Sequence, residues 1–151
     1  MIRQIAERIP PRLRGILTAD RAIDIRPVEP ADFFLPEPRP PEQMLWLRAT
    51  GEMPGDLVEH QAVLAYASDY QLLATALQPH GLTVRTPQLQ VASLDHSIWF
   101  HKPFCMDEWL LYVMDSPIAA GARGFSRGSV YTRDGRLVAS VAQEGLMRIR
   151  G

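Results

Sequence analysis

The chain has 151 residues, of which 46% are hydrophobic and 22% are charged, and its formal net charge is -1. This length and balance predict one folded domain whose core is stable without disulfides or metal. A near-neutral chain is not expected to bind nucleic acid, and no apolar run approaches the roughly 20 residues that cross a bilayer. A single cysteine, Cys105, and a charged N-terminal segment without an apolar signal-peptide core favour the cytoplasm.

Proline breaks up the first part of the chain. Eight of the 13 prolines lie within the first 41 residues, and proline interrupts both helices and sheets. We therefore expect residues 1–19 to form a lead-in and residues 20–151 to form the domain. Within the proline-rich part, residues 22–28 alternate apolar and polar side chains and predict an edge strand, and residues 44–49 predict a second strand.

A single long helix is predicted to begin near Leu57 and to end by Pro79. Asp56 is a suitable N-cap, and proline cannot continue the helical hydrogen-bond ladder. Apolar side chains repeat at intervals of three and four residues, which indicates one buried helix face. The residues of that face are Val63, Tyr66, Ala67, Tyr70, Leu73, Ala74 and Leu77.

Asp69 stands beside this apolar face. A carboxylate taken out of water costs free energy unless hydrogen bonds or charges compensate it, and such positions are enriched in functional groups. A lone helical aspartate more often points into solvent, so Asp69 becomes a candidate only in combination with other residues.

After the helix the hydrophobic periodicity changes to two, which is typical of strands. Asp134-Gly135 favours a tight hairpin between two of the runs, and the runs are expected to pair as an antiparallel meander. One long helix wrapped by a curved antiparallel sheet is an α+β architecture, the hotdog fold, and its open sheet edges favour association with a second unit. The four strand-like runs cover residues 89–102, 109–120, 122–133 and 136–150.

The most specific signal lies in residues 93–112, which contain SLDHSIWFHKPF followed by EWLLY. This stretch resembles the acyl-CoA thioesterase II family, the TesB type. Three further segments are similar to the same family in the same order: LAYASDYQLL around Asp69, ARGFSRGSVYTRDG from Ala122 and LVASVAQEGLMR from Leu137. Together they cover roughly residues 20–150.

The resemblance implies that the chain corresponds to the second of two fused hotdog units, preceded by the remnant of a linker. The family's catalytic trio lies in that unit and corresponds by position to Asp69, Ser93 and Gln143. Ser93 stands where some members have threonine, and the change keeps the hydroxyl. The implied activity is that of an enzyme, an acyl-CoA thioesterase that hydrolyses fatty acyl-CoA to free fatty acid and CoA.

The three residue types suit this chemistry independently of the family. Thioester hydrolysis requires a water at the carbonyl carbon, a group that accepts its proton, and donors for the developing oxyanion. A buried Asp69 can accept the proton, while the Ser93 hydroxyl and the Gln143 amide can orient the water. Acyl-CoA is the expected partner, and neither a covalent nucleophile nor a metal or other cofactor is expected.

Alternatives remain open at this point. The chain can be a non-catalytic acyl-CoA-binding or scaffold unit, because the missing half can supply part of the acyl pocket. A third interpretation, enoyl-CoA hydratase on the same fold, requires a histidine five residues after the helical aspartate; Ala74 stands there, so this interpretation is discounted. Adjacent Asp95 and His96 on one strand would point to opposite faces, which favours a structural role, with His96 near the cleft.

A lone unit is expected to form a homodimer or a higher homo-oligomer.

Overall fold

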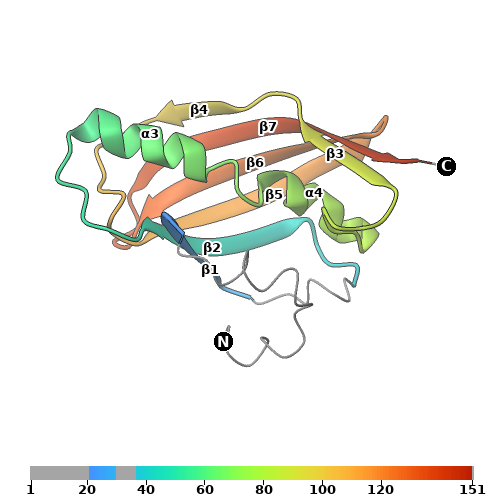
Figure 1. The fold of residues 1–151 in the computed structure, drawn as a ribbon, viewed down its shortest axis with the longest axis horizontal. Helices are drawn as coiled ribbons and strands as arrows, with labels where there is room; N and C mark the ends of the chain where they lie inside the picture. Colours follow the sequence, from blue (N-terminus) through green and yellow to red (C-terminus); the bar gives the residue numbers. More distant parts are fainter. Residues whose placement is uncertain (1–20, 30–36, 151) are drawn as a thin grey trace.

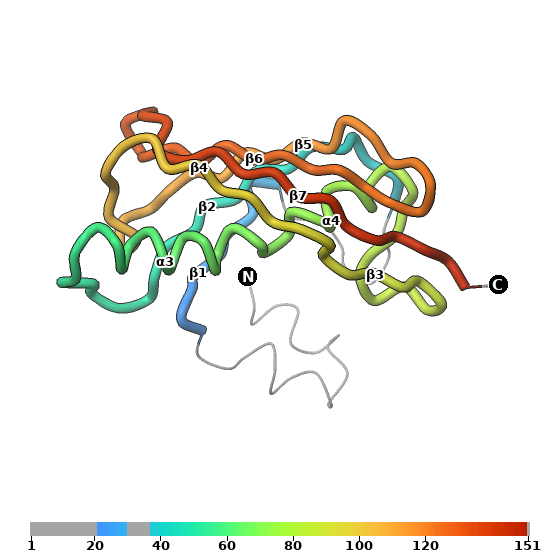
Figure 2. Tube along the Cα trace, turned by 90° about the horizontal axis from the view of Figure 1, so that it is seen from above, coloured from blue at the N-terminus to red at the C-terminus, as the bar shows by residue number. Residues whose placement is uncertain are grey.

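The computed structural model describes residues 21–29 and 37–150. Its seven strands form one antiparallel sheet that curls around two helices (Figure 1). Seen from above, both helices lie along the same face of the sheet (Figure 2). The predicted α+β hotdog arrangement is confirmed, whereas the predicted lead-in over residues 1–19 lies outside the described residues.

The strand order is β1-β2-β5-β6-β7-β3, and β4 also pairs with β7. The predicted turn at Asp134-Gly135 is confirmed between β6 and β7, where Gly135 has a φ of 86°. The strands are β1 (Ile23–Pro27), β2 (Glu42–Ala49), β3 (Leu89–Ser93), β4 (Ser97–Phe100), β5 (Leu110–Ala120), β6 (Arg123–Thr132) and β7 (Leu137–Ile149).

The expected single helix is two helices, α3 (Leu57–Ala67) and α4 (Leu72–Leu77), followed by the 3₁₀ turn η1 (Gln78–His80). The predicted N-cap is confirmed, because the Asp56 side chain accepts hydrogen bonds from the backbone N–H groups of Val58 and Glu59. The prediction of a continuous helix was wrong, since the chain turns between the two helices.

Side chains of the sheet stabilise this break. The Tyr112 hydroxyl on β5 donates to the Ser68 carbonyl at 2.9 Å, and the Gln43 amide on β2 donates to the Gln71 carbonyl at 2.8 Å. Gln71 itself adopts a left-handed backbone with a φ of 68°, which costs a non-glycine residue conformational free energy. The break is therefore held by contacts from strands distant in the sequence.

The break also changes which helical side chains are buried. Ala67 and Leu77 lie in the core as predicted, but Tyr66 is 62% exposed and Tyr70 is 37% exposed. The two rings meet edge to face, with their centroids 5.4 Å apart. A periodicity that assumes one straight helix fails here because α4 begins at a new rotational position after the turn.

The predicted strand over residues 89–102 breaks as well, into β3 and β4. Between them, the N–H groups of Leu94 and Asp95 donate to the Glu144 carbonyl, and Asp95 Oδ1 accepts from the Glu144 N–H at 2.7 Å. The assumption that Asp95 and His96 lie on a continuous strand was therefore wrong. Side-chain contacts join this break to the break in the helix, from Ser93 to Asp69 and from His96 to Ser68.

Two glycines allow α4 to approach the sheet closely. Gly124 and Gly145 pair across β6 and β7. A Cβ added to Gly145 would lie 2.3 Å from Leu73 Cδ1, and one added to Gly124 would lie 2.6 Å from the Ala76 Cβ.

Among the described residues, no helix is long and apolar enough to cross a membrane.

Candidate active site

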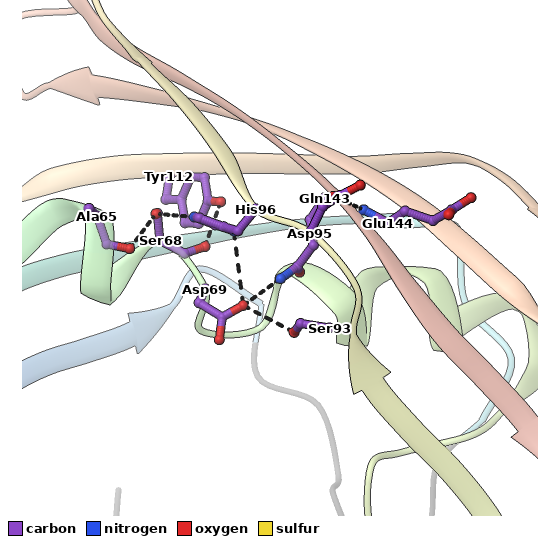
Figure 3. Close-up of polar contacts among 9 residues, drawn as sticks. All are labelled: Ala65, Ser68, Asp69, Ser93, Asp95, His96, Tyr112, Gln143 and Glu144. Atoms are coloured by element: carbon purple, nitrogen blue, oxygen red, sulfur yellow. Dashed lines mark hydrogen bonds and ion pairs between the residues drawn. The ribbon is translucent and has the colours of Figure 1, made fainter.

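The predicted residues Asp69, Ser93 and Gln143 meet where the helix is broken (Figure 3). Gln143 Nε2 on β7 donates to Asp69 Oδ1 at 2.5 Å, and Ser93 Oγ at the end of β3 donates to the same oxygen at 3.3 Å. The structure thus brings together three side chains separated by up to 74 residues. Their catalytic roles stay predictions.

The side chains of Gln143 and Asp69 differ greatly in exposure. Gln143 is 1% exposed, whereas the Asp69 side chain is 54% exposed. The expectation of a buried acid was therefore wrong for this chain, because the turn after α3 carries Asp69 to the surface. Asp69 and Ser93 line a hollow of about 360 Å³, together with Tyr66, Tyr70 and the 94–96 segment.

The two carboxylate oxygens of Asp69 have different surroundings. Both donors bind Oδ1, and within residues 21–29 and 37–150 no hydrogen bond to Oδ2 is present. Figure 3 shows Oδ2 pointing away from this cluster. A carboxylate held by one oxygen keeps the other available to accept a proton, so this arrangement suits a general base.

Tyr112 supports the site from the core. Its side chain is fully buried, and its hydroxyl donates to the carbonyl of Ser68, the residue before Asp69. Burial raises the pKa of Tyr112 far above its usual range, and the charge of Asp69 adds to the effect. The phenol therefore stays protonated and keeps its role as a donor.

A second tyrosine pair lies at the rim of the hollow. Tyr70 donates its hydroxyl hydrogen to the Tyr66 hydroxyl at 2.6 Å. This hydrogen bond is the main reason that the pKa of Tyr70 is raised, with partial burial as a second cause. The pair gives the rim two ring faces beside the candidate base.

His96 is the site residue whose contacts the sequence did not reveal. Its Nε2 lies 2.8 Å from Ser68 Oγ, and its Nδ1 lies 4.0 Å from Asp69 Oδ1. Asp95 and His96 both line the hollow, contrary to expectation, because the strand break removes the alternation of faces. The motif at residues 93–96 marked the segment, but no local pattern indicates that the ring turns toward Asp69.

The family model described as acyl-CoA thioesterase matches residues 16–146 of the chain. The chain belongs to the acyl-CoA thioesterase family.

Members of the acyl-CoA thioesterase family are similar to the chain over nearly all of its length. Acyl-CoA thioesterase 2 of Haemophilus influenzae is 37% identical over 98% of this chain and 52% of its own length. Acyl-coenzyme A thioesterase 8 of Homo sapiens is 41% identical over 97% of this chain and 46% of its own. The crystal structure of the acyl-CoA thioesterase II TesB2 from Mycobacterium marinum superposes with a TM-score of 0.74 and 42% identity, covering 86% of this chain and 50% of that one.

The chain therefore spans about half the length of the thioesterases it matches. This coverage fits the prediction of a TesB-type unit that corresponds to the second of two fused hotdog units.

Proposed function

We propose that this chain hydrolyses fatty acyl-CoA with water to give a free fatty acid and CoA. The observation that carries the proposal is the Asp69 carboxylate, whose Oδ1 is held by Gln143 and Ser93 while Oδ2 is left as a proton acceptor at a hollow. Family membership and relatives named acyl-CoA thioesterases support the same reaction.

In the proposed mechanism, Asp69 Oδ2 removes a proton from a water molecule as the water oxygen attacks the thioester carbonyl carbon. The tetrahedral intermediate then expels the CoA thiolate, which takes up the proton that Asp69 accepted. General base catalysis of this kind contributes about a hundredfold to ten thousandfold in rate. Because Gln143 and Ser93 contact the carboxylate directly, we assign them the task of holding Asp69, and Ser93, which is exposed, can also contact the water.

An assay with matched variants tests the proposal. Purified wild type, Asp69→Asn and Asp69→Ala are compared for thiol release from medium-chain and long-chain acyl-CoA. We expect kcat to fall at least about a hundredfold in both variants. Thermal stability should change little in Asp69→Asn, because the asparagine oxygen can still accept from Gln143, and should fall in Asp69→Ala, which leaves the buried Gln143 amide without this acceptor. Undiminished turnover in Asp69→Asn would refute the role of the base.

The second candidate is a non-catalytic acyl-CoA-binding or scaffold unit. It is favoured by the match to about half of each relative, because a fused partner can supply part of a binding surface. Titration calorimetry with a non-hydrolysable acyl-CoA analogue separates the two. Tight binding by a wild-type protein that releases no thiol supports the scaffold.

We further propose that two or more copies of the chain associate. The strands β1 and β3–β4 lie at the two edges of the sheet in the described part of the chain, and the large side chains of Leu94 and Trp99 on the second edge are each 53% exposed. Such edges are commonly covered in stable proteins. A monodisperse monomer in light scattering at micromolar concentration would contradict this proposal.

The cytoplasmic location stays a prediction from the sequence.

A further inference from the structure

Polar contacts run from Ser68 through His96 to Asp69, the proposed base. Ser68 Oγ lies 2.8 Å from His96 Nε2, and the opposite ring nitrogen, Nδ1, lies 4.0 Å from Asp69 Oδ1. Figure 3 shows the ring between the two side chains. The order serine, histidine, aspartate is that of a nucleophilic triad.

Ser68 is not placed to act as a nucleophile. Its side chain is 0% exposed, and Oγ lies 3.0 Å from the Ala65 carbonyl of the same helix. A thioester carbon cannot approach a hydroxyl enclosed between helix and sheet. The contacts therefore suit a structural task, which is to hold the His96 ring.

The residue that the His96 ring contacts and the chain segment that carries His96 are both anchored by hydrogen bonds. On one side, the Ser68 carbonyl accepts a hydrogen bond from buried Tyr112. On the other side, the backbone groups of Glu144 bind Leu94 and Asp95, the two residues that precede His96. Glu144 directly follows Gln143 on β7, so the same strand positions the amide donor and the histidine.

The negative charge of Asp69 favours a hydrogen on the nearer ring nitrogen of His96, Nδ1. Nδ1 is buried and has no hydrogen-bond partner among the described residues. A lone pair on Nδ1 would face the negative carboxylate, whereas an N–H there is attracted to it. The Ser68 hydroxyl can rotate its hydrogen from the Ala65 carbonyl to Nε2, which leaves Nδ1 protonated.

We propose that His96 is a positioning residue that directs Nδ1–H at Asp69 Oδ1 and, with Gln143 and Ser93, turns Oδ2 toward the substrate water. The inference rests on the proposed function and adds a third donor to the same carboxylate oxygen. A distance of 4.0 Å is longer than a hydrogen bond, and such contacts commonly tighten when substrate binds.

Two substitutions separate the two ends of the ring. In His96→Asn the side-chain amide reaches about as far as Nδ1 and can still donate to Asp69, whereas in His96→Gln it reaches about as far as Nε2 and contacts Ser68 instead. We expect kcat for His96→Gln to be about tenfold to a hundredfold lower than for His96→Asn, since misplacement by about 1 Å costs up to that factor. KM is expected to be similar in both variants.

The exposed His101 provides the matched control. Its Nε2 also contacts a serine, Ser140, at 2.9 Å, but outside the hollow. The variants His101→Asn and His101→Gln are expected to differ little from each other in kcat. Equal losses in the two His96 variants, or a greater loss in His96→Asn, would overturn the inference.

A measurement that does not depend on turnover distinguishes this inference from the proposed function. Long-range proton–nitrogen NMR spectra of the histidine-labelled protein at about pH 8 report which nitrogen of a neutral ring is protonated, and the signal missing in His96→Gln identifies His96. We expect an Nδ1–H ring whose Nδ1 signal moves in Asp69→Asn. An Nε2–H ring, or a signal unaffected by Asp69→Asn, would overturn the inference even if the chain hydrolyses acyl-CoA.

Discussion

Gln143 donates its amide hydrogen to Asp69 Oδ1 at 2.5 Å, from a side chain that is 1% exposed. A neutral donor at this position stabilises the carboxylate without adding a charge to the core. The other end of the same amide, Oε1, is buried without a partner among the described residues. The orientation of Gln143 is therefore set mainly by its bond to Asp69.

The substitution Gln143→Glu is expected to destabilise the protein in a pH-dependent way. Repulsion from Asp69 and burial both raise the pKa of the introduced carboxyl above its unfolded value of about 4.3. Its contribution to stability is then present at low pH and is lost as pH rises through the folded pKa. The melting temperature should fall further below that of wild type at pH 7 than at about pH 4.5. A deficit equal to that of the uncharged control Gln143→Met at both pH values would contradict this expectation.

Replacement of Ser93 tests whether its hydroxyl matters for turnover. Ser93→Ala removes the donor to Asp69 Oδ1, whereas Ser93→Thr keeps it and adds a methyl group at an exposed strand end. A hydrogen bond to a charged group contributes about 1.5–3 kcal/mol, so we expect kcat to fall roughly tenfold to a hundredfold in the alanine variant. The threonine variant should stay within a few-fold of wild type, as measured by thiol release. Similar losses in both variants would indicate that the site rejects any change of shape at this position.

Tyr112→Phe is expected to lower the free energy of unfolding at neutral pH and to change how that free energy depends on pH in alkaline solution. Loss of the hydroxyl leaves the Ser68 carbonyl without this donor, at a cost of about 1–3 kcal/mol. Because burial raises the pKa of Tyr112 in the folded state, its contribution is complete below the unfolded value of 10.0 and is lost as pH rises above it. Denaturant unfolding should show that the difference in unfolding free energy between wild type and variant becomes smaller above that pH. A difference that stays constant with pH would count against the role of Tyr112 burial.

The close approach of α4 predicts a specific cost for Gly145→Ala. Its new Cβ would lie 2.3 Å from Leu73 Cδ1, and overpacking of this kind costs about 1–3 kcal/mol. Gly51→Ala is the matched control, since nothing lies within 4 Å of its added Cβ. Urea unfolding should show a loss for Gly145→Ala that is absent for Gly51→Ala. Equal stability of the two variants would mean that Leu73 moves aside without cost.

Local patterns in the sequence predicted the type and order of the elements. The alternation in residues 22–28 and 44–49 corresponds to β1 and β2, the Asp56 cap begins α3, and Asp134-Gly135 forms a turn between β6 and β7. These features depend on side chains within a few residues of one another. The resemblance to thioesterases added Asp69, Ser93 and Gln143, whose meeting point no local pattern specifies.

Tertiary contacts decided the two breaks that shape the site. The turn after α3 is held by Tyr112, 44 residues from Ser68, and by Gln43, 28 residues from Gln71. The break in the edge strand is held by the backbone of Glu144, which binds Asp95 from 49 residues away. Hydrophobic periodicity describes one element at a time, so it predicted a straight helix and a continuous strand. Which side chains reach across the fold depends on how the sheet curls, and that decided the exposure of Asp69 and the approach of His96.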